Sequence, residues 1–217
     1  MKTRFLGFSL GAVLLGVALG AGCRSTYYST MEKFGVYKRD LLKKRVVAAR
    51  DEQKEASQQF KDALTQLKEL YGFQGGTLEK TWEALKKDYD RSVTRADAVH
   101  QRIRDVETVA NDLFKEWEGE IKQISSESLR ASSRKELGET RGRYDELHAA
   151  LKQAEKSMDP VLTALRDHVL YLKHNLNAQA IASLKGEAIS IQTEITRLIA
   201  DMNASIARAD AFIQQMQ

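Results

Sequence analysis

Apolar residues spaced alternately by four and three positions constrain this sequence more than any other feature. The longest such heptad pattern consists of Leu78, Trp82, Leu85, Tyr89, Ser92, Ala96, Val99, Ile103, Val106, Ala110, Leu113, Trp117, Glu120 and Ile124. A strand repeats every two residues and cannot produce this spacing. The pattern therefore predicts one long α-helix that packs against other helices.

Three further heptad patterns predict three further helices. The first consists of Leu42, Val46, Ala49, Gln53, Ala56, Phe60, Ala63, Leu67 and Leu70. The second consists of Leu137, Thr140, Tyr144, Leu147, Leu151, Ala154, Met158, Val161, Leu165, His168 and Leu172. The third consists of Ile181, Leu184, Ala188, Ile191, Ile195, Leu198, Met202, Ser205, Ala209, Phe212 and Met216.

Capping and turn signals set the expected ends of these helices. Ser29 with Glu32, and Ser133 with Glu136, have the spacing of capping boxes, and the glycine-rich segment 72–76 predicts a turn. We therefore expect helices over residues 29–71, 78–124, 134–175 and 178–216. Each would be about 60–70 Å long at about 1.5 Å per residue.

The scarcity of turn-forming residues supports an all-helical fold. The sequence holds one proline and 13 glycines, and five of those glycines precede Cys23. A β fold needs turn residues at short intervals, whereas long helices need few. Pro160 lies inside the third helix, and the heptad pattern keeps its phase there, which predicts a kinked or closely resumed helix.

These patterns predict an all-α protein: an elongated antiparallel bundle, or coiled coil, of four long helices. The third helix is kinked or split at Pro160 in this prediction. One alternative is two hairpins that separate at Pro160 and form a bent rod of five helices. Another is a rod that completes its core by forming a homodimer, because a heptad pattern does not say which helix covers it.

The first 22 residues have the layout of a secretory signal peptide. Lys2 and Arg4 precede an apolar run over residues 5–19, and small residues lead to Cys23, the only cysteine. This end resembles the bacterial lipobox, although Gly20 stands where leucine is usual. The resemblance implies that Cys23 carries a covalent diacylglycerol and an N-acyl chain and becomes the first residue of the mature protein.

Two other interpretations of this segment remain open: an ordinary cleaved signal, and an uncleaved N-terminal anchor. In the lipoprotein interpretation, residues 23–28 form a lipidated tether and residues 29–217 form the bundle. Arg24 follows the cysteine, where aspartate usually signals retention in the inner membrane. The expected location is therefore the periplasmic face of the outer membrane.

Basic residues are concentrated near this tether. The stretch 24–50 holds eight basic and two acidic residues, whereas the whole chain has a net charge of +4. The basic residues nearest one another are Lys38, Arg39, Lys43, Lys44 and Arg45. They form a candidate membrane-proximal basic patch that contacts anionic lipid head groups, or else one solvated helix face.

No arrangement of residues in the sequence indicates catalysis. The four histidines are scattered, no second cysteine completes a zinc site, and residues 75–80 lack the order of a phosphate-binding loop. His168 lies in a heptad pattern and is expected to be a satisfied core residue. We therefore expect no enzyme activity, no cofactor, no metal and no nucleic-acid partner.

The signal segment, the basic first helix and the heptads together resemble a family of uncharacterised bacterial predicted lipoproteins with coiled coils, grouped as a domain of unknown function. The resemblance extends over the mature chain, including Tyr27, Tyr28 and Tyr37. It implies a lipid-anchored envelope protein that acts as a structural or partner-binding helical module, with an envelope protein or a second copy as partner. The alternative is a helical protein that binds the membrane surface through its basic first helix.

Overall fold

The computed structural model describes residues 37–72 and 78–216. The predicted signal peptide, Cys23, the tether 23–28 and the predicted helix start at residues 29–36 lie outside these residues. Contacts divide the chain into two units, Met1–Tyr37 and Lys38–Gln217, and the described helices belong to the second unit.

The described residues form five helices and no strands. The helices are α2 (Lys38–Tyr71), α3 (Leu78–Ile121), α4 (Glu127–Lys173), α5 (Ala178–Lys185) and α6 (Ala188–Gln215). The predicted all-helical class is thus confirmed. The helices are less equal than expected, because α4 has 47 residues and α6 has 28.

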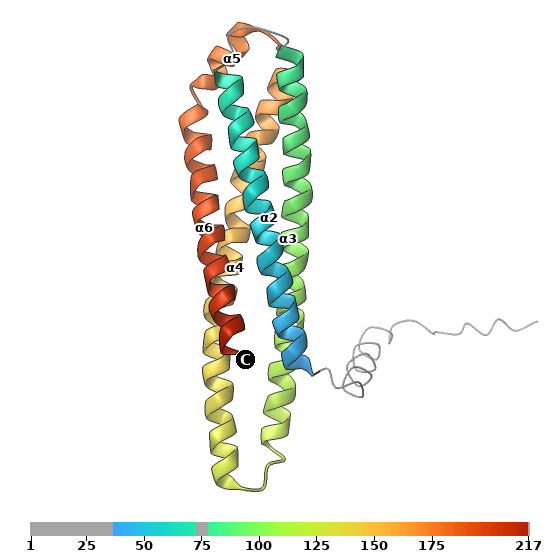
Figure 1. Cartoon of the computed structure of the whole chain (residues 1–217), viewed down its shortest axis with the longest axis vertical. Helices are drawn as coiled ribbons and strands as arrows, with labels where there is room; N and C mark the ends of the chain where they lie inside the picture. The colour runs from blue at the N-terminus through green and yellow to red at the C-terminus, as the bar shows by residue number, and fades with distance from the viewer. Residues whose placement is uncertain (1–36, 73–77, 217) are drawn as a thin grey trace, which may run out of the picture. The chain divides into compact units, whose positions relative to one another are not determined.

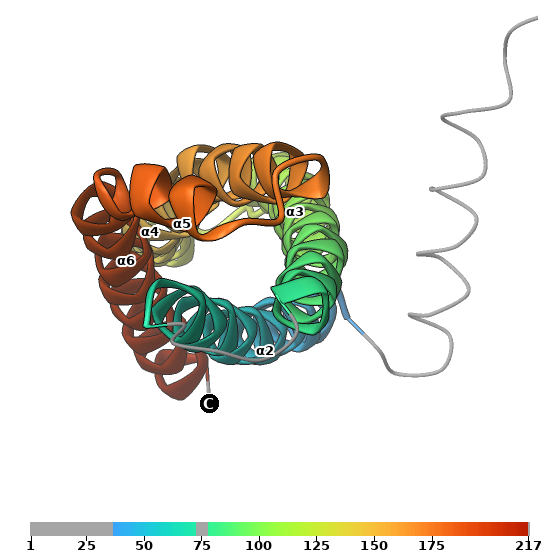
Figure 2. The same ribbon diagram turned by 90° about the horizontal axis from the view of Figure 1, so that it is seen from above.

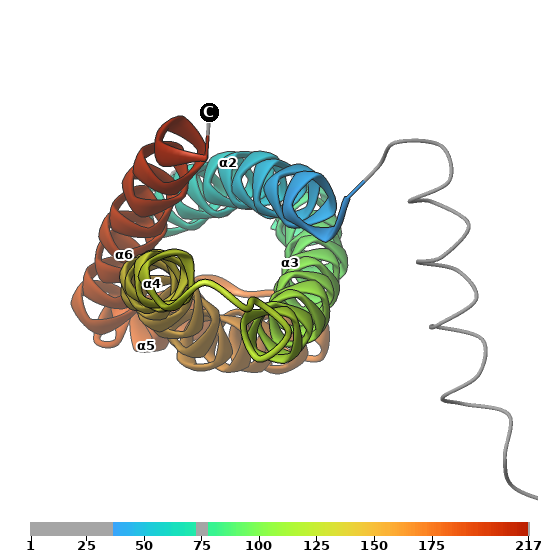
Figure 3. The same ribbon diagram turned by 90° about the horizontal axis from the view of Figure 1, so that it is seen from below.

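The long helices lie side by side, and successive long helices run in opposite directions (Figure 1). Each contacts two neighbours, in the ring order α2, α3, α4, α6 and back to α2. This ring is visible in the two end views (Figures 2 and 3). The short α5 lies at one end of the bundle and leads into α6 (Figure 1).

The heptad positions form the core inside this ring. All nine heptad residues predicted over 42–70 are buried on α2, and Phe60 has no exposed surface. On α4 every predicted heptad residue except Thr140 is buried. Burial of these side chains is the main favourable contribution to folding, and the heptad spacing is what brings them to one face.

The α3 helix ends at Ile121 instead of the predicted residue 124. At this end burial leaves the heptad positions: Glu120, a heptad position, is exposed, whereas Ile121 is buried with 4% of its surface accessible. Lys38 at the start of α2 pairs with Glu116, so the last turn of α3 extends past the beginning of α2. In Figure 1, the ends of α3 and α4 project beyond α2 and α6 as a two-helix hairpin. The core pattern shifts where these neighbours end.

The start of α4 also differs from the prediction. The helix begins at Glu127, with Ser126 as its N-cap, instead of at residue 134. Ser133, the predicted cap, lies inside the helix and accepts a hydrogen bond from Trp117 Nε1 at 2.9 Å. Pro160 also lies inside α4, which continues without a break to Lys173. Of the expected outcomes at Pro160, a split helix is therefore wrong.

The predicted helix 178–216 is interrupted at Gly186 and Glu187, which separate α5 from α6. The buried positions keep their heptad phase across the interruption, from Leu184 to Ala188 and Ile191. The phase explains why the sequence pattern alone predicts one helix here.

Candidate functional site

The predicted lipid-attachment residue, Cys23, lies outside the described residues. The predicted basic residues lie on α2. Lys38 is buried, with 9% of its surface accessible, and its Nζ forms an ion pair with Glu116 on α3. Arg45 pairs with Asp105, also on α3, at 3.3 Å. Two of the five predicted basic residues therefore hold α2 and α3 together.

The other three basic residues point away from that interface. Arg39 and Lys44 are exposed, Lys43 is partly buried, and Arg39 Nε lies 3.9 Å from Asp40 Oδ1 on the same helix. At about 100° per residue, the five positions from 38 to 45 are distributed around the whole circumference of α2. The structure does not bring them together on one face.

The interhelical acids Glu116 and Asp105 are the residues that sequence reasoning missed. They lie 78 and 60 residues from their basic partners, and no local spacing connects them. The only hint of these ion pairs in the sequence is the equal length of the predicted helices, which places the start of one helix near the end of the next. Equal length does not define which residues of two neighbouring helices lie opposite each other.

His168 and Tyr71 form a buried polar pair between α4 and α2. His168 Nδ1 lies 2.8 Å from the carbonyl oxygen of Ala164, which only accepts, so Nδ1 donates that hydrogen bond. Nε2 therefore accepts from the Tyr71 hydroxyl at 3.0 Å. Burial, with a smaller effect of Glu187, raises the pKa of Tyr71 to about 12. His168 is thus the satisfied core histidine that its heptad position predicts.

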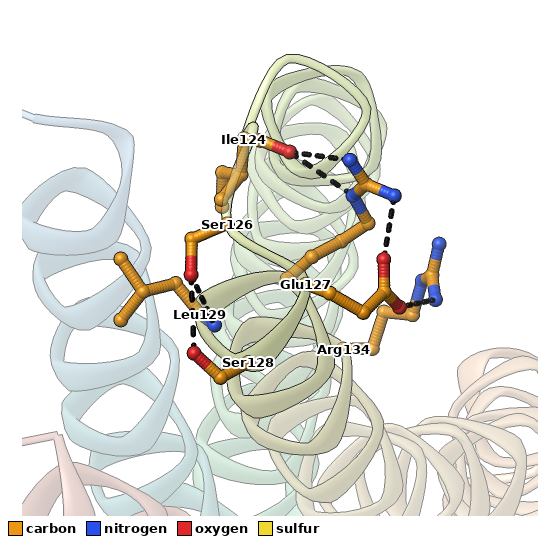
Figure 4. Close-up of polar contacts among 7 residues, drawn as sticks. Ile124, Ser126, Glu127, Ser128, Leu129 and Arg134 are labelled. Atoms are coloured by element: carbon orange, nitrogen blue, oxygen red, sulfur yellow. Dashed lines mark hydrogen bonds and ion pairs between the residues drawn. The ribbon is translucent and has the colours of Figure 1, made fainter.

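The α3–α4 turn is held by its own polar contacts (Figure 4). Arg130 donates from two guanidinium nitrogens to the carbonyl of Ile124, at 3.0 and 2.7 Å, and pairs with Glu127 at 2.8 Å. Ser126 Oγ accepts from the backbone N–H of Leu129. These contacts fix the turn and leave the Leu129 side chain 62% exposed. Arg130 and Glu127 at the start of α4 are thus paired within the chain itself.

A groove of about 300 Å³ lies between α4 and α6 beside Pro160. It is lined by Gln153, Lys156, Ser157, Pro160, Glu194 and Arg197. Because proline has no backbone N–H, the carbonyl of Lys156 lacks the usual helical donor four residues later. Both basic and acidic side chains line the groove, and they are Lys156, Arg197 and Glu194.

The described residues contain no group of three or more histidine, cysteine or acidic side chains arranged to hold a metal ion. Among the same helices, none is long and apolar enough to cross a membrane.

The fold and the polar contacts define the class of the protein: it is a helical bundle. Ion pairs and the buried Tyr71–His168 pair join its helices to one another, and capping bonds hold the helix ends. The chain belongs to DUF2959, a family of proteins of unknown function, whose model matches residues 27–216. No curated protein matches it. The family match covers all the described helices and begins a few residues after Cys23.

Proposed function

We propose that this protein is a lipid-anchored protein of the cell envelope, and that its helical bundle is a structural or partner-binding module. The observation that carries the proposal is Cys23, the only cysteine, placed directly after an apolar segment that ends in small residues. A lipid on that thiol would hold the chain at a membrane surface, and Arg24 favours the periplasmic face of the outer membrane.

The bundle supports the second half of the proposal. Its four long helices, paired antiparallel, form a rod in which α4 alone is about 70 Å long at about 1.5 Å per residue. Several of its charged side chains pair between helices, as in Arg45–Asp105 and Arg208–Glu146. A rod of this kind suits a spacer or a docking surface for another envelope protein or a second copy. The proposal includes no catalytic step, cofactor or nucleic acid.

Incorporation of a labelled fatty acid in a bacterial host tests the anchor. We expect the wild-type chain to carry the label in the membrane fraction, and Cys23→Ser to lose the label. A matched control is Ser25→Ala, two residues further along, which should keep the label. Label that persists in Cys23→Ser, or a wild-type chain without label, would contradict the proposal.

The ion pairs of Lys38 and Arg45 weigh against the alternative in which the first helix itself binds lipid head groups, because both cations already have acidic partners on α3. Binding of a chain that begins at residue 24, without the apolar segment and the cysteine, to vesicles containing anionic lipid separates the two functions. We expect Arg39→Gln, Lys43→Gln and Lys44→Gln together to change binding less than twofold. A large, salt-sensitive loss would support the lipid-binding alternative instead.

A further inference from the structure

Three buried polar side chains in the middle of the bundle have no hydrogen-bond partner among residues 37–72 and 78–216. They are Gln53 and Ser57 on α2, and Ser205 on α6, with accessible fractions of 0%, 3% and 0%. Both the Oε1 and Nε2 atoms of Gln53 are unpaired. Ser92 shows the contrast, because its equally buried hydroxyl donates to the carbonyl of Asp88 at 2.7 Å.

These three side chains lie at one level of the bundle, in the interface between α2 and α6. Arg50 NH1 pairs with Asp210 Oδ1 at 2.8 Å, which fixes the register of these two antiparallel helices. Ser205 lies five residues before Asp210, and the position five residues after Arg50 falls between Gln53 and Ser57. The α2–α6 interface therefore contains a polar layer made of these three residues.

A buried polar group without a partner raises the free energy of the closed bundle, because it gave up its hydrogen bonds to water on folding. Opening of the interface lets water reach the polar layer and recovers those bonds. Apolar side chains at the same three positions would gain nothing from exposure. The polar layer thus favours separation of α2 from α6 over separation at the other interfaces.

The other interfaces of the ring have more polar cross-links. Between α2 and α3 these include Lys38–Glu116, Arg45–Asp105 and the contacts of Arg95 with Glu52 and Glu55. Between α3 and α4 they include His148–Glu107, Trp117–Ser133 and Arg141–Glu118. Between α4 and α6 they include Arg208–Glu146 and the contacts of Gln153 and Ser157 with Asp201. Between α2 and α6, the pair that joins the described residues is Arg50–Asp210.

The junction before α6 gives the helix a place to pivot. Gly186 and Glu187 separate α5 from α6, and Glu187 makes no side-chain capping hydrogen bond at the start of α6. From these observations we propose that the bundle opens at the α2–α6 interface, with α6 swinging about residues 186–187 while α2, α3 and α4 stay together. The opening is a conformational device of the fold and does not depend on the proposed lipid anchor.

Hydrogen exchange of the full chain, read by mass spectrometry, tests this opening. A helix that leaves its neighbours loses the packing that stabilises it, so its backbone hydrogen bonds break and its amides exchange without global unfolding. We expect the amides of α6 to exchange at least about tenfold faster than the best-protected amides of α3 and α4. Equal protection of α6, α3 and α4 would overturn the proposal.

Variants connect the exchange to the polar layer. Gln53→Leu, Ser57→Ala and Ser205→Ala together should slow exchange of α6 at least about tenfold. Gly138→Ala on α4 is the matched control, because it stabilises a helix that stays closed and should leave α6 exchange unchanged. The proposal fails if the triple variant does not slow α6, or if Gly138→Ala slows α6 equally.

A second pair of variants tests the same interface without altering the core. Arg50→Ala removes the α2–α6 ion pair and should accelerate exchange of α6. Arg45→Ala removes an α2–α3 ion pair instead and should leave α6 unaffected. Equal effects of the two variants on α6 would show that opening is not specific to the α2–α6 interface, and would also overturn the proposal.

Discussion

Leu151 and Leu170 both lie on α4, yet their environments are opposite. Leu151 has no accessible surface, whereas Leu170 is 55% exposed. Truncation of a fully buried leucine removes its burial energy and leaves a cavity, so Leu151→Ala should destabilise the protein by about 2–5 kcal/mol. Leu170→Ala should cost less than about 0.5 kcal/mol. Urea unfolding followed by circular dichroism measures both, and similar losses would contradict the assigned core.

Two buried tyrosines predict how stability responds to alkaline pH. Burial is the main cause that raises the pKa of Tyr71 to about 12 and that of Tyr144 to about 12. Tyrosine in an unfolded chain loses its proton near about pH 10. Their contribution to stability is therefore complete below about pH 10 and is lost as the pH rises from there toward about 12.

Spectrophotometric titration should show two tyrosines that ionise well above about pH 10, and unfolding midpoints should fall over the same pH range. Tyr71→Phe should remove part of this alkaline dependence. It should also cost about 1 kcal/mol at neutral pH, because His168 Nε2 loses its donor. Tyr144→Phe should also remove part of the alkaline dependence. Tyr171→Phe is the control for position, because this side chain is 41% exposed and its truncation should leave the stability at neutral pH nearly unchanged.

At the residue scale, the heptad spacing predicted the core well because burial on a helix follows its period. Gln53 and Ser205 were placed at core positions in this way, and both are buried. Burial no longer follows the heptad pattern at Glu120, which is exposed because the neighbouring helices end there. Burial of Lys38 was not predictable either, because its partner Glu116 is brought close only by the pairing of α2 with α3.

At the scale of single helices, the ends were harder to predict than the helices themselves. Ser126 and Ser133 are both serines in a serine-rich stretch, and each precedes plausible helical sequence. Ser126 is the cap, and Trp117 bonds to Ser133. The choice between them depends on a tertiary contact with α3, which local sequence does not contain.

Helical glycines provide a prediction at this scale. A Cβ added at Gly138 in α4 would meet no atom within 4 Å. Alanine is favoured over glycine in a helix, so Gly138→Ala should stabilise the protein by about 0.5–1 kcal/mol. Thermal unfolding measures the gain. Gly72→Ala is the matched comparison and should gain less, because its Cβ would lie 3.3 Å from the carbonyl of Lys68.

At the scale of the whole bundle, the start of α2 and the end of α6 lie toward the same end of the rod. Lys38 precedes Arg50 by twelve residues, and Gln215 follows Asp210 by five, so the two ends differ by about 10 Å along the axis at about 1.5 Å per residue. The pair Arg50–Asp210 is the reference point for this estimate. A flexible linker of about ten residues spans such a gap.

A circular permutant should therefore fold. Joining residue 215 to residue 38 and opening the chain between residues 72 and 78 keeps every described helix intact. We expect helical content and cooperative unfolding close to those of the original chain. A permutant opened at Ala154, in the buried middle of α4, should lose both. Failure of the first permutant would contradict the described neighbourhood of α2 and α6.

The position of these ends also limits how the bundle can be extended. Any domain fused after the last residue of α6 would begin toward the same end of the rod as the start of α2. The end formed by α5 lies farthest from both attachment points, and a reporter inserted in the connection 174–177 would face the opposite direction. Fusions before α2 and after α6 would therefore both start toward the same end of the bundle.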